Sequence, residues 1–292
     1  MFFIYRSLTL IFYPVLTLII FMRTLTKKEH PKRYKEKIFS SSFRVERKEN
    51  TKLIWFHAAS VGEFKSILPL IKELNSKYSS LEFLITSVTL SSGKLANEEL
   101  KKFENVHHRF FPIDVSFLIQ KFILFWRPDI IFLVDSEIWP NLIFQAKKDK
   151  IPLGIINARI TKKTFKRWMR LKIFAKSIFN NIKIGFPQNR ETNSFLKKLN
   201  VNRVKLIGNL KFSENNDNNL SKINSKLKTE FNKKKIWVAS STHKNEEMFC
   251  AKTHIELKKK INNILTIIIP RHIHRANEIK KDIKNLNLKV TY

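Results

Sequence analysis

From residue 52 onward, the chain alternates between short apolar runs and longer amphipathic stretches, which leaves few possible folds. The apolar runs are rich in branched and aromatic residues, as parallel strands covered on both faces should be. Strands that alternate with helices predict a doubly wound, parallel α/β sheet. The predicted strands are 53–57, 83–87, 106–110, 130–134, 153–157 and 182–186, and helical stretches such as 64–75, 117–125, 141–148, 165–179 and 191–199 lie between them.

A second α/β unit follows a polar run at 213–235, whose Asn- and Lys-rich composition is typical of a linker. Its predicted strands are 236–239 and 264–269, with a helix from 246 to about 261 between them. No G-x-G-x-x-G follows the first strand and no G-x-x-x-x-G-K-[ST] occurs in the sequence, which disfavours a dinucleotide enzyme or a P-loop ATPase. The predicted organisation is a helix at 1–26, a first domain at 27–212, a linker at 213–235 and a second domain at 236–292.

The chain carries a formal net charge of +32, from 56 Lys and Arg against 24 Asp and Glu. This excess implies an anionic partner: nucleic acid, a phospholipid surface or a phosphorylated substrate. Part of the positive charge can be explained by AT-rich coding. Such coding makes Lys, Asn, Ile and Phe abundant and Gly scarce, as they are in this chain. Nucleic acid is disfavoured, because the sequence has no recognition helix, zinc finger or aromatic RNA-binding signature. The single Cys250 excludes an internal disulfide and fits a reducing compartment.

The N-terminal segment has no charged residue between Arg6 and Arg23, which is short for a membrane span of roughly 20 residues. No small-residue cleavage site follows, so a signal peptide is disfavoured. A basic cluster follows instead, and by the positive-inside rule it places the rest of the chain on the cytoplasmic side, against anionic lipid headgroups. We predict an uncleaved membrane anchor. A buried helix is the alternative, and a kink at Pro14 leaves a tilted or interfacial helix open. The cluster consists of Lys27, Lys28, Lys32, Arg33, Lys35 and Lys37.

The motif His-Ala-Ala-Ser-Val-Gly-Glu, at residues 57–63, ends the first predicted strand and begins an amphipathic helix. It places the Glu63 carboxylate at the carboxyl edge of the sheet, where ligands bind in open α/β folds. Two roles fit this position. Ser60-x-x-Glu63 is a capping box, in which the carboxylate bonds to its own backbone, and the spacing alone favours this role. A catalytic role requires carboxylate oxygens that are free to reach a substrate.

Polar residues follow other predicted strands as well. Asp-Ser-Glu-Ile-Trp-Pro-Asn, at residues 135–141, follows the fourth strand, and Asn-Ala-Arg, at 157–159, ends the fifth. Gly-Asn-Leu-Lys-Phe, at 208–212, precedes the predicted linker. By residue type alone, acids in a turn are more often solvated than catalytic, and Arg159 is more often paired with a carboxylate than with a phosphate. The basic stretch at 162–176 reads either as a membrane-facing amphipathic surface or as the solvated face of a packed helix.

The segments at 135–141, 157–159 and 208–212, together with the motif at 57–63, resemble the bacterial 3-deoxy-D-manno-octulosonic acid (Kdo) transferases that act on lipid A. The resemblance implies a glycosyltransferase-B fold with two Rossmann-like domains and an N-terminal membrane anchor. It also implies transfer of Kdo from CMP-Kdo to the lipid A precursor (lipid IVA) at the cytoplasmic face of the inner membrane. That reaction is described as inverting and metal-independent, and the chain would need no cofactor beyond its donor substrate.

The resemblance also implies roles for single residues. Glu63 would be the catalytic base, Glu137 would support the acceptor side of the site and the transition state, and Lys211 would stabilise charge as the donor breaks down. Asp135 stands where the family usually has a Glu. The positions implied for the nucleotide are Ser241, Thr242, His243, Pro270 and Arg271, the last at a strand end where its planar guanidinium suits a phosphate.

Three further expectations follow from the sequence and the resemblance. The helix N-terminus should lower the pKa of Glu63, whereas Glu137 should raise it. No metal site is predicted, because no carboxylate or Cys completes a recognisable spacing with His272 and His274. Family members continue beyond the position of Tyr292 with a Gly-rich segment and an Asn-x-x-Glu element, so we expect an incomplete second domain. The alternatives are another membrane-associated glycosyltransferase-B enzyme and a truncated, non-catalytic, basic lipid-binding protein.

Overall fold

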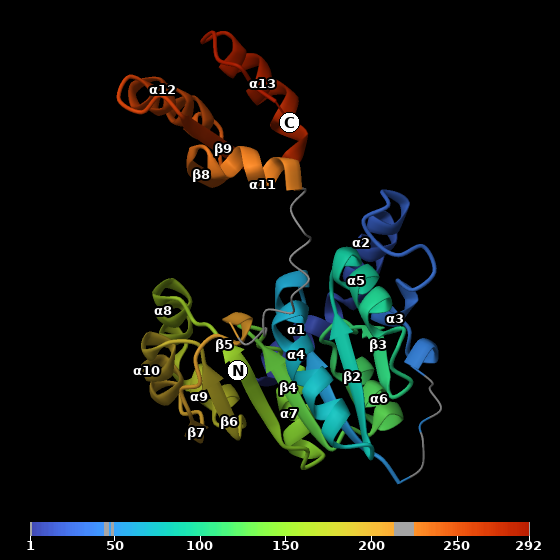
Figure 1. The fold of residues 1–292 in the computed structure, drawn as a ribbon. Coiled ribbons are helices and arrows are strands. Elements are labelled where there is room, and N and C mark those ends of the chain that lie inside the picture. Colours follow the sequence, from blue (N-terminus) through green and yellow to red (C-terminus); the bar gives the residue numbers. More distant parts are fainter. Residues whose placement is uncertain (1, 44–46, 48–49, 213–224, 292) are drawn as a thin grey trace. The chain divides into compact units, whose positions relative to one another are not determined.

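The computed structural model describes residues 2–43, 47, 50–212 and 225–291 of the chain (Figure 1). These residues divide into two compact units, Met1–Asn215 and Asn216–Tyr292. Of the predicted linker, residues 213–224 lie outside the described residues. Helix α11 (Ser225–Asn232) occupies much of the remainder, so the weak apolar periodicity of this run conceals a helix.

The first unit is built on one seven-stranded sheet in which all neighbouring strands are parallel (Figure 1). The strands lie in the order β3-β2-β1-β4-β5-β6-β7, so the winding direction reverses between β1 and β4. In doubly wound sheets, a crevice opens at such a reversal, outside the carboxyl ends of the strands. The strands are β1 (Lys52–His57), β2 (Leu81–Ser87), β3 (Val106–Phe110), β4 (Ile130–Val134), β5 (Leu153–Ala158), β6 (Ile184–Pro187) and β7 (Arg203–Val204).

Helices cover both faces of this sheet, which explains why its strands are apolar throughout. Successive residues of β1 show the arrangement, because Trp55 belongs to one core and Phe56 to the other. Helices α6 (Ser116–Trp126), α7 (Pro140–Lys148) and α9 (Lys172–Phe179) pack on the Trp55 side. Helices α4 (Val61–Lys77) and α5 (Leu90–Leu100) pack on the Phe56 side. The remaining helical elements of this unit are α3 (Lys35–Ile38), η1 (Ser40–Phe43), α8 (Lys162–Arg170), α10 (Arg190–Lys198) and η2 (Leu210–Phe212).

The parallel α/β sheet predicted from the sequence is confirmed, and its six predicted strands lie within two residues of the observed bounds. Helix α5 was not predicted, because its residues include Ser and Gly and show little apolar periodicity. Thr89 caps its N-terminus, where its side-chain oxygen accepts from the Ser92 N–H at 3.2 Å. The helix predicted at 165–179 is broken at Leu171 into α8 and α9. Phe165 and Trp168 of α8 pack against the core, as on an ordinary packed helix.

The N-terminal apolar segment forms two helices, α1 (Phe2–Ile11) and α2 (Tyr13–Leu25), instead of one continuous anchor. They are bent by 51° at Phe12, and Pro14 in the first turn of α2 explains the break. In the described part of the chain, no single helix has both the length and the apolarity to cross a membrane, whereas this bent pair satisfies both measures together.

Polar contacts attach α1 to the sheet domain. The hydroxyl of Tyr5 donates to Asp114 Oδ2 at 3.0 Å, and Asn141 Nδ2 lies 3.2 Å from Thr9 Oγ1. The opposite side of the helix pair exposes many large apolar residues, including Phe3, Ile11, Leu18 and Leu25. One side of the helix pair therefore contacts the domain, and the apolar residues of the other side are exposed.

Two members of the predicted basic cluster are engaged inside the protein. Lys37 is buried and paired with Glu29, and Arg33 pairs with Glu36 at 2.6 Å. The cluster's exposed charge therefore comes from its other members, Lys27, Lys28, Lys32 and Lys35.

The second unit contains a two-stranded parallel sheet, β8 (Lys235–Thr242) and β9 (Ile264–Pro270) (Figure 1). Helix α12 (Glu246–Lys258) connects the strands and packs on β9, and η3 (Ile273–Arg275) leads into α13 (Ala276–Lys284). The core is small: Ala251, Ile279 and Ile283 are its buried members. Each strand also exposes apolar residues, such as Val238 and Ile269, each 51% exposed.

Candidate active site

The reversal of winding between β1 and β4 brings two acids of the sequence together. Glu63 lies in the first turn of α4, directly after β1, and Glu137 lies in the turn after β4. Both carboxylates therefore belong to the edge of the sheet where ligand crevices form. Each is partly exposed, and the charge of Glu137 acts on Glu63.

The Glu63 carboxylate is turned back on the start of its own helix. Oε2 accepts from the Ala59 N–H at 2.7 Å, and Oε1 accepts from the Ser60 hydroxyl at 2.9 Å. Ser60 Oγ in turn accepts from the Glu63 N–H at 3.4 Å, which completes a capping box. The catalytic interpretation required free oxygens, and in this geometry that requirement is not met. The capping role, which the spacing favoured, is the observed one.

Burial sets the pKa of Glu63, which rises to about 7. The hydrogen bonds from Ser60 and the Ala59 N–H lower the pKa, whereas the charges of Glu137 and Asp135 raise it further. The expectation that the helix N-terminus would hold this pKa down is wrong, because desolvation of a half-buried carboxylate outweighs that effect. The result is an acid that exchanges its proton near neutral pH.

Two strand ends at this edge have the left-handed backbone conformation that non-glycine residues rarely adopt. Asp135 has φ of 62° and Asn157 has φ of 54°. Their segments are linked, since the Arg159 N–H donates to the Asp135 carbonyl at 3.3 Å. Strained backbone of this kind is concentrated at functional sites. Burial raises the pKa of Asp135, and the nearby charges of Arg159 and Lys211 act in the opposite direction.

Asn157 also places Lys211 beside the capping box. Its side-chain oxygen accepts from the Leu210 N–H at 3.0 Å, which fixes the segment that carries Lys211. The Lys211 ammonium lies 3.7 Å from the point where a side chain on Gly62 would begin, so it sits against the turn that holds Glu63. The structure therefore gathers Glu63, Glu137 and Lys211 into one cluster at the sheet edge.

Two ring nitrogens that the sequence did not predict lie beside Glu137. Trp139 Nε1 donates to Glu137 Oε2 at 2.9 Å, and His57 Nε2 lies 3.6 Å from the same oxygen. His57 is completely buried, at the last position of β1. A polar residue at the end of an otherwise apolar strand is the signal that would have found it.

The five positions implied for the nucleotide lie together at the carboxyl ends of β8 and β9. The Arg271 N–H donates to the Thr242 carbonyl at 3.0 Å, and Thr242 pairs with Pro270 across the sheet. Ser241 has φ of 60° at a register shift in β8, and the His243 N–H donates to Glu246 at 2.7 Å. The side chains of Ser241, His243 and Arg271 are exposed, whereas Thr242 is buried.

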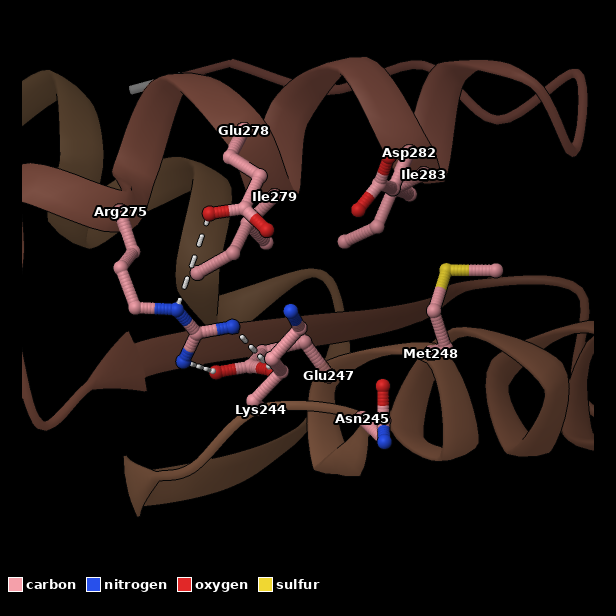
Figure 2. Close-up of a pocket in the computed structure, with 9 residues that line it drawn as sticks. All are labelled: Lys244, Asn245, Glu247, Met248, Arg275, Glu278, Ile279, Asp282 and Ile283. Atoms are coloured by element: carbon pink, nitrogen blue, oxygen red, sulfur yellow. Dashed lines mark hydrogen bonds and ion pairs between the residues drawn. The ribbon is translucent and has the colours of Figure 1, made fainter.

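An ion pair joins the segments that follow β8 and β9, through Glu247 of α12 and Arg275 of η3. Figure 2 shows the Arg275 guanidinium reaching across to the Glu247 carboxylate at one side of a small pocket between α12 and α13. The two bonds measure 2.9 and 3.2 Å, and the Thr242 hydroxyl donates to the same carboxylate at 3.0 Å. Burial alone would raise the pKa of Glu247, but these hydrogen bonds outweigh it and hold the pKa below its usual value.

Metal binding finds no support in the described residues, where His, Cys, Asp and Glu side chains form no group of three placed to share an ion. His272 and His274 lie 5.6 Å apart, measured between ring centroids, on the exposed turn after β9.

Comparison with known proteins assigns the family. The pattern that defines the 3-deoxy-D-manno-octulosonic-acid transferases (Kdo transferases) matches residues 32–214, which include Glu63, Glu137 and Lys211. The chain belongs to the Kdo transferase family. It is 32% identical over 280 residues to the 3-deoxy-D-manno-octulosonic acid transferase of Rickettsia bellii, covering 94% of this chain and 65% of that protein.

Two further proteins place the chain among its relatives. A probable mitochondrial 3-deoxy-D-manno-octulosonic acid transferase of Arabidopsis thaliana is 32% identical over 98% of this chain and 65% of its own length. The chain thus spans about two thirds of the length of these relatives. A solved UDP-GlcNAc 2-epimerase from Neisseria meningitidis aligns over 81% of this chain and 69% of its own, with a TM-score of 0.57. At 15% identity, that likeness concerns the fold alone.

Proposed function

We propose that this protein is a glycosyltransferase that transfers Kdo from CMP-Kdo to the lipid A precursor, lipid IVA, in lipopolysaccharide synthesis. The observation that carries this proposal is the family match, which spans the cluster of Glu63, Glu137 and Lys211 at the reversal of the sheet. Transfer from a sugar nucleotide needs a base for the acceptor hydroxyl, cations for the leaving phosphate and exclusion of water. The cluster and the edge of the second unit offer groups for the first two.

Glu63 is the proposed base. Its pKa of about 7 supports this role, because a general base works best when its pKa lies near the operating pH. The observed cap means that one oxygen must change partners before reaction. In the proposed step, Oε2 keeps the Ala59 N–H while Oε1 exchanges the Ser60 hydroxyl for the acceptor hydroxyl. The role of Glu63 therefore rests on the family likeness and on its pKa, and a free carboxylate is not part of the support.

The remaining implied residues serve the donor in this proposal. Lys211 neutralises developing negative charge beside Glu63, and the exposed Arg271 guanidinium grips the phosphate of CMP with its planar donors. The acceptor oxygen attacks the anomeric carbon as the bond to the cytidylate oxygen breaks, so a single displacement inverts that centre. A donor with one phosphate gives no strong reason to require a divalent ion.

We further propose that the protein works on the anionic cytoplasmic face of the inner membrane. The bent α1–α2 pair supports this, because it exposes apolar side chains such as Phe3, 78% exposed, while its other side contacts the domain. An amphipathic element of this kind can lie in the interface plane, and the exposed Lys27, Lys28, Lys32 and Lys35 suit anionic headgroups.

The test uses membranes with labelled CMP-Kdo and tetraacylated lipid A precursor. The full chain should form a new labelled lipid, and another glycosyltransferase or a lipid-binding protein should not. Glu63→Gln keeps an oxygen for the Ala59 N–H but cannot take a proton, so it should abolish transfer with the fold intact. The matched control, Ser60→Ala, weakens the cap and keeps the carboxylate, and it should retain transfer. Wild-type transfer by Glu63→Gln would refute the role of Glu63.

A further inference from the structure

His57 is held in an entirely buried position that gives its ring no access to solvent. The Phe111 ring lies 4.1 Å from it, centroid to centroid, and the Trp139 ring lies 5.9 Å away. Burial among these rings lowers the pKa of His57, so the imidazole is neutral and carries one proton.

Two buried hydrogen bonds favour one nitrogen as the carrier of that proton. Trp55 Nε1 and His57 Nδ1 each lie 2.9 Å from Thr86 Oγ1. An indole N–H can only donate, so Thr86 accepts from Trp55. The Thr86 carbonyl, which also acts on the His57 ring, accepts from the Ala58 N–H at 2.9 Å. Donation of the Thr86 hydroxyl proton to His57 Nδ1 gives both groups a partner, and it leaves the imidazole proton on Nε2.

The Nε2 atom faces Glu137. It has no hydrogen-bond partner among the described residues, and Glu137 Oε2 lies 3.6 Å away. This is slightly too long for a hydrogen bond, but contacts of catalytic groups are often long before substrate binds. Trp139 Nε1 already donates to the same oxygen at 2.9 Å. Two ring nitrogens thus lie beside the same oxygen of Glu137.

We propose that His57 is a positioning residue: the buried chain Trp55–Thr86–His57 presents an N–H to Glu137 and fixes how that carboxylate meets the substrate. The inference rests on the proposed function for its effect on transfer, whereas the arrangement of the proton stands on geometry. It assigns a role to the histidine that ends β1, three residues before the capping residue Ser60.

Nitrogen-15 spectra of the histidine rings test the arrangement in the full chain. The chain has 8 His, and the signal lost in His57→Phe identifies the ring of interest. We expect the neutral Nε2–H form for His57, unchanged in Thr86→Ser, and an upfield move of the Nε2 signal in Glu137→Ala. A proton on Nδ1, a charged ring, or an Nε2 signal indifferent to Glu137→Ala would overturn the proposal.

The second unit offers a matched control. His254 Nδ1 also lies 2.8 Å from a threonine hydroxyl, that of Thr266. Thr266→Val should move the His254 signals and leave those of His57 in place. Movement of the His57 signals in this variant would mean that they report general loosening, which would count against the proposal.

Kinetics supply the second readout. His57→Phe keeps a ring against Phe111 but has no nitrogen, so kcat for transfer should fall on the order of tenfold while KM changes by less than about twofold. Thr86→Val should behave like His57→Phe, and Thr86→Ser should retain wild-type kcat. Equal kcat in Thr86→Val and wild type would contradict a positioning role. If the unmodified chain transfers no Kdo, the proposed function fails, and the nitrogen signals still decide whether His57 faces Glu137 as described.

Discussion

The two units place acids at similar points, just after a strand and at the start of a helix, yet they hold them by opposite means. In the first unit, burial dominates at Glu63 and raises its pKa to about 7. In the second unit, Arg275 forms an ion pair with Glu247, and the pKa of Glu247 falls below its usual value. An acid with a raised pKa is suited to exchange protons, whereas one paired with an arginine is suited to hold structure. The difference favours proton exchange at Glu63 and a structural role for Glu247.

The largest expected effect comes from core truncation, because the two cores differ in size. Phe83 is completely buried in β2, and Phe83→Ala should cost about 3–5 kcal/mol of unfolding free energy. Ile279 lies in the small core of the second unit, where the surroundings can collapse, and Ile279→Ala should cost about 2 kcal/mol. Amide hydrogen exchange resolved by peptide measures each unit separately. Equal losses in both units from either variant would show that the units unfold together.

Removing the charge of Glu247 should have the next largest effect. Glu247→Gln removes the closer of two carboxylates at Arg275, since Glu278 lies 3.9 Å away, and should cost about 1.5–3 kcal/mol in the second unit. The folded pKa of Glu247 is depressed, so its contribution should be present above the ordinary pKa and be lost as the pH falls through the folded value. The control is Glu256→Gln, whose pair with Lys259 is exposed and should matter by less than about 0.5 kcal/mol. Equal losses of unfolding free energy in Glu247→Gln and Glu256→Gln would contradict the structural role of Glu247.

Loss of the cap at Glu63 should have a smaller effect on stability. Ser60→Ala removes the oxygen that accepts from the Glu63 N–H and should cost about 1 kcal/mol in the first unit. Chemical denaturation followed by circular dichroism measures it. Ser76→Ala, at an exposed position near the other end of α4, provides the control and should be nearly neutral. A neutral result for Ser60→Ala would mean that the Ala59 N–H alone holds the carboxylate.

The smallest expected effect is a slope of stability with pH. The Glu63 carboxyl titrates near 4.5 when unperturbed and near 7 in the folded chain, so the folded state binds more protons between these values. The free energy of unfolding should therefore fall as the pH rises through this window, and Glu63→Gln should remove that part of the slope. Solvent at the half-buried carboxylate reduces the effect. Thermal unfolding of both proteins at several pH values measures it, and parallel curves would contradict the raised pKa.

The sequence was sufficient for six of the seven strands of the first sheet, all but the two-residue β7, and for the neighbourhood of its acids. Apolar runs mark strands, and the carboxyl ends of parallel strands share one edge, so Glu63 and Glu137 could be placed together without coordinates. The pKa of Glu63 was beyond reach, because it depends on how the turn and its neighbours shield the carboxylate from water. The direction of the Glu63 oxygens was equally open, since one spacing serves both a cap and a base.

Features that depend on distant contacts could not be read from local pattern. The proposed role of His57 depends on its contacts with Thr86 on the neighbouring strand and with Glu137 after β4. The docking of α1 depends on Asp114, more than a hundred residues away along the chain. In the second unit, Arg275 lies beyond Pro270 and Arg271, the positions that the resemblance implies for the nucleotide. Only the fold brings Arg275 to Glu247.

The carboxylate of Asp114 connects two segments that lie far apart in the sequence. It accepts from Tyr5 in α1, and it also accepts from the N–H groups of Asn141 and Leu142, which begin α7. The turn that carries Glu137 leads directly into that helix. Helix α1 is thus joined to the start of α7, next to the turn with Glu137, through Asp114 and through Thr9, whose hydroxyl oxygen lies 3.2 Å from Asn141 Nδ2. Shortened proteins that lack the first dozen residues would lose both contacts.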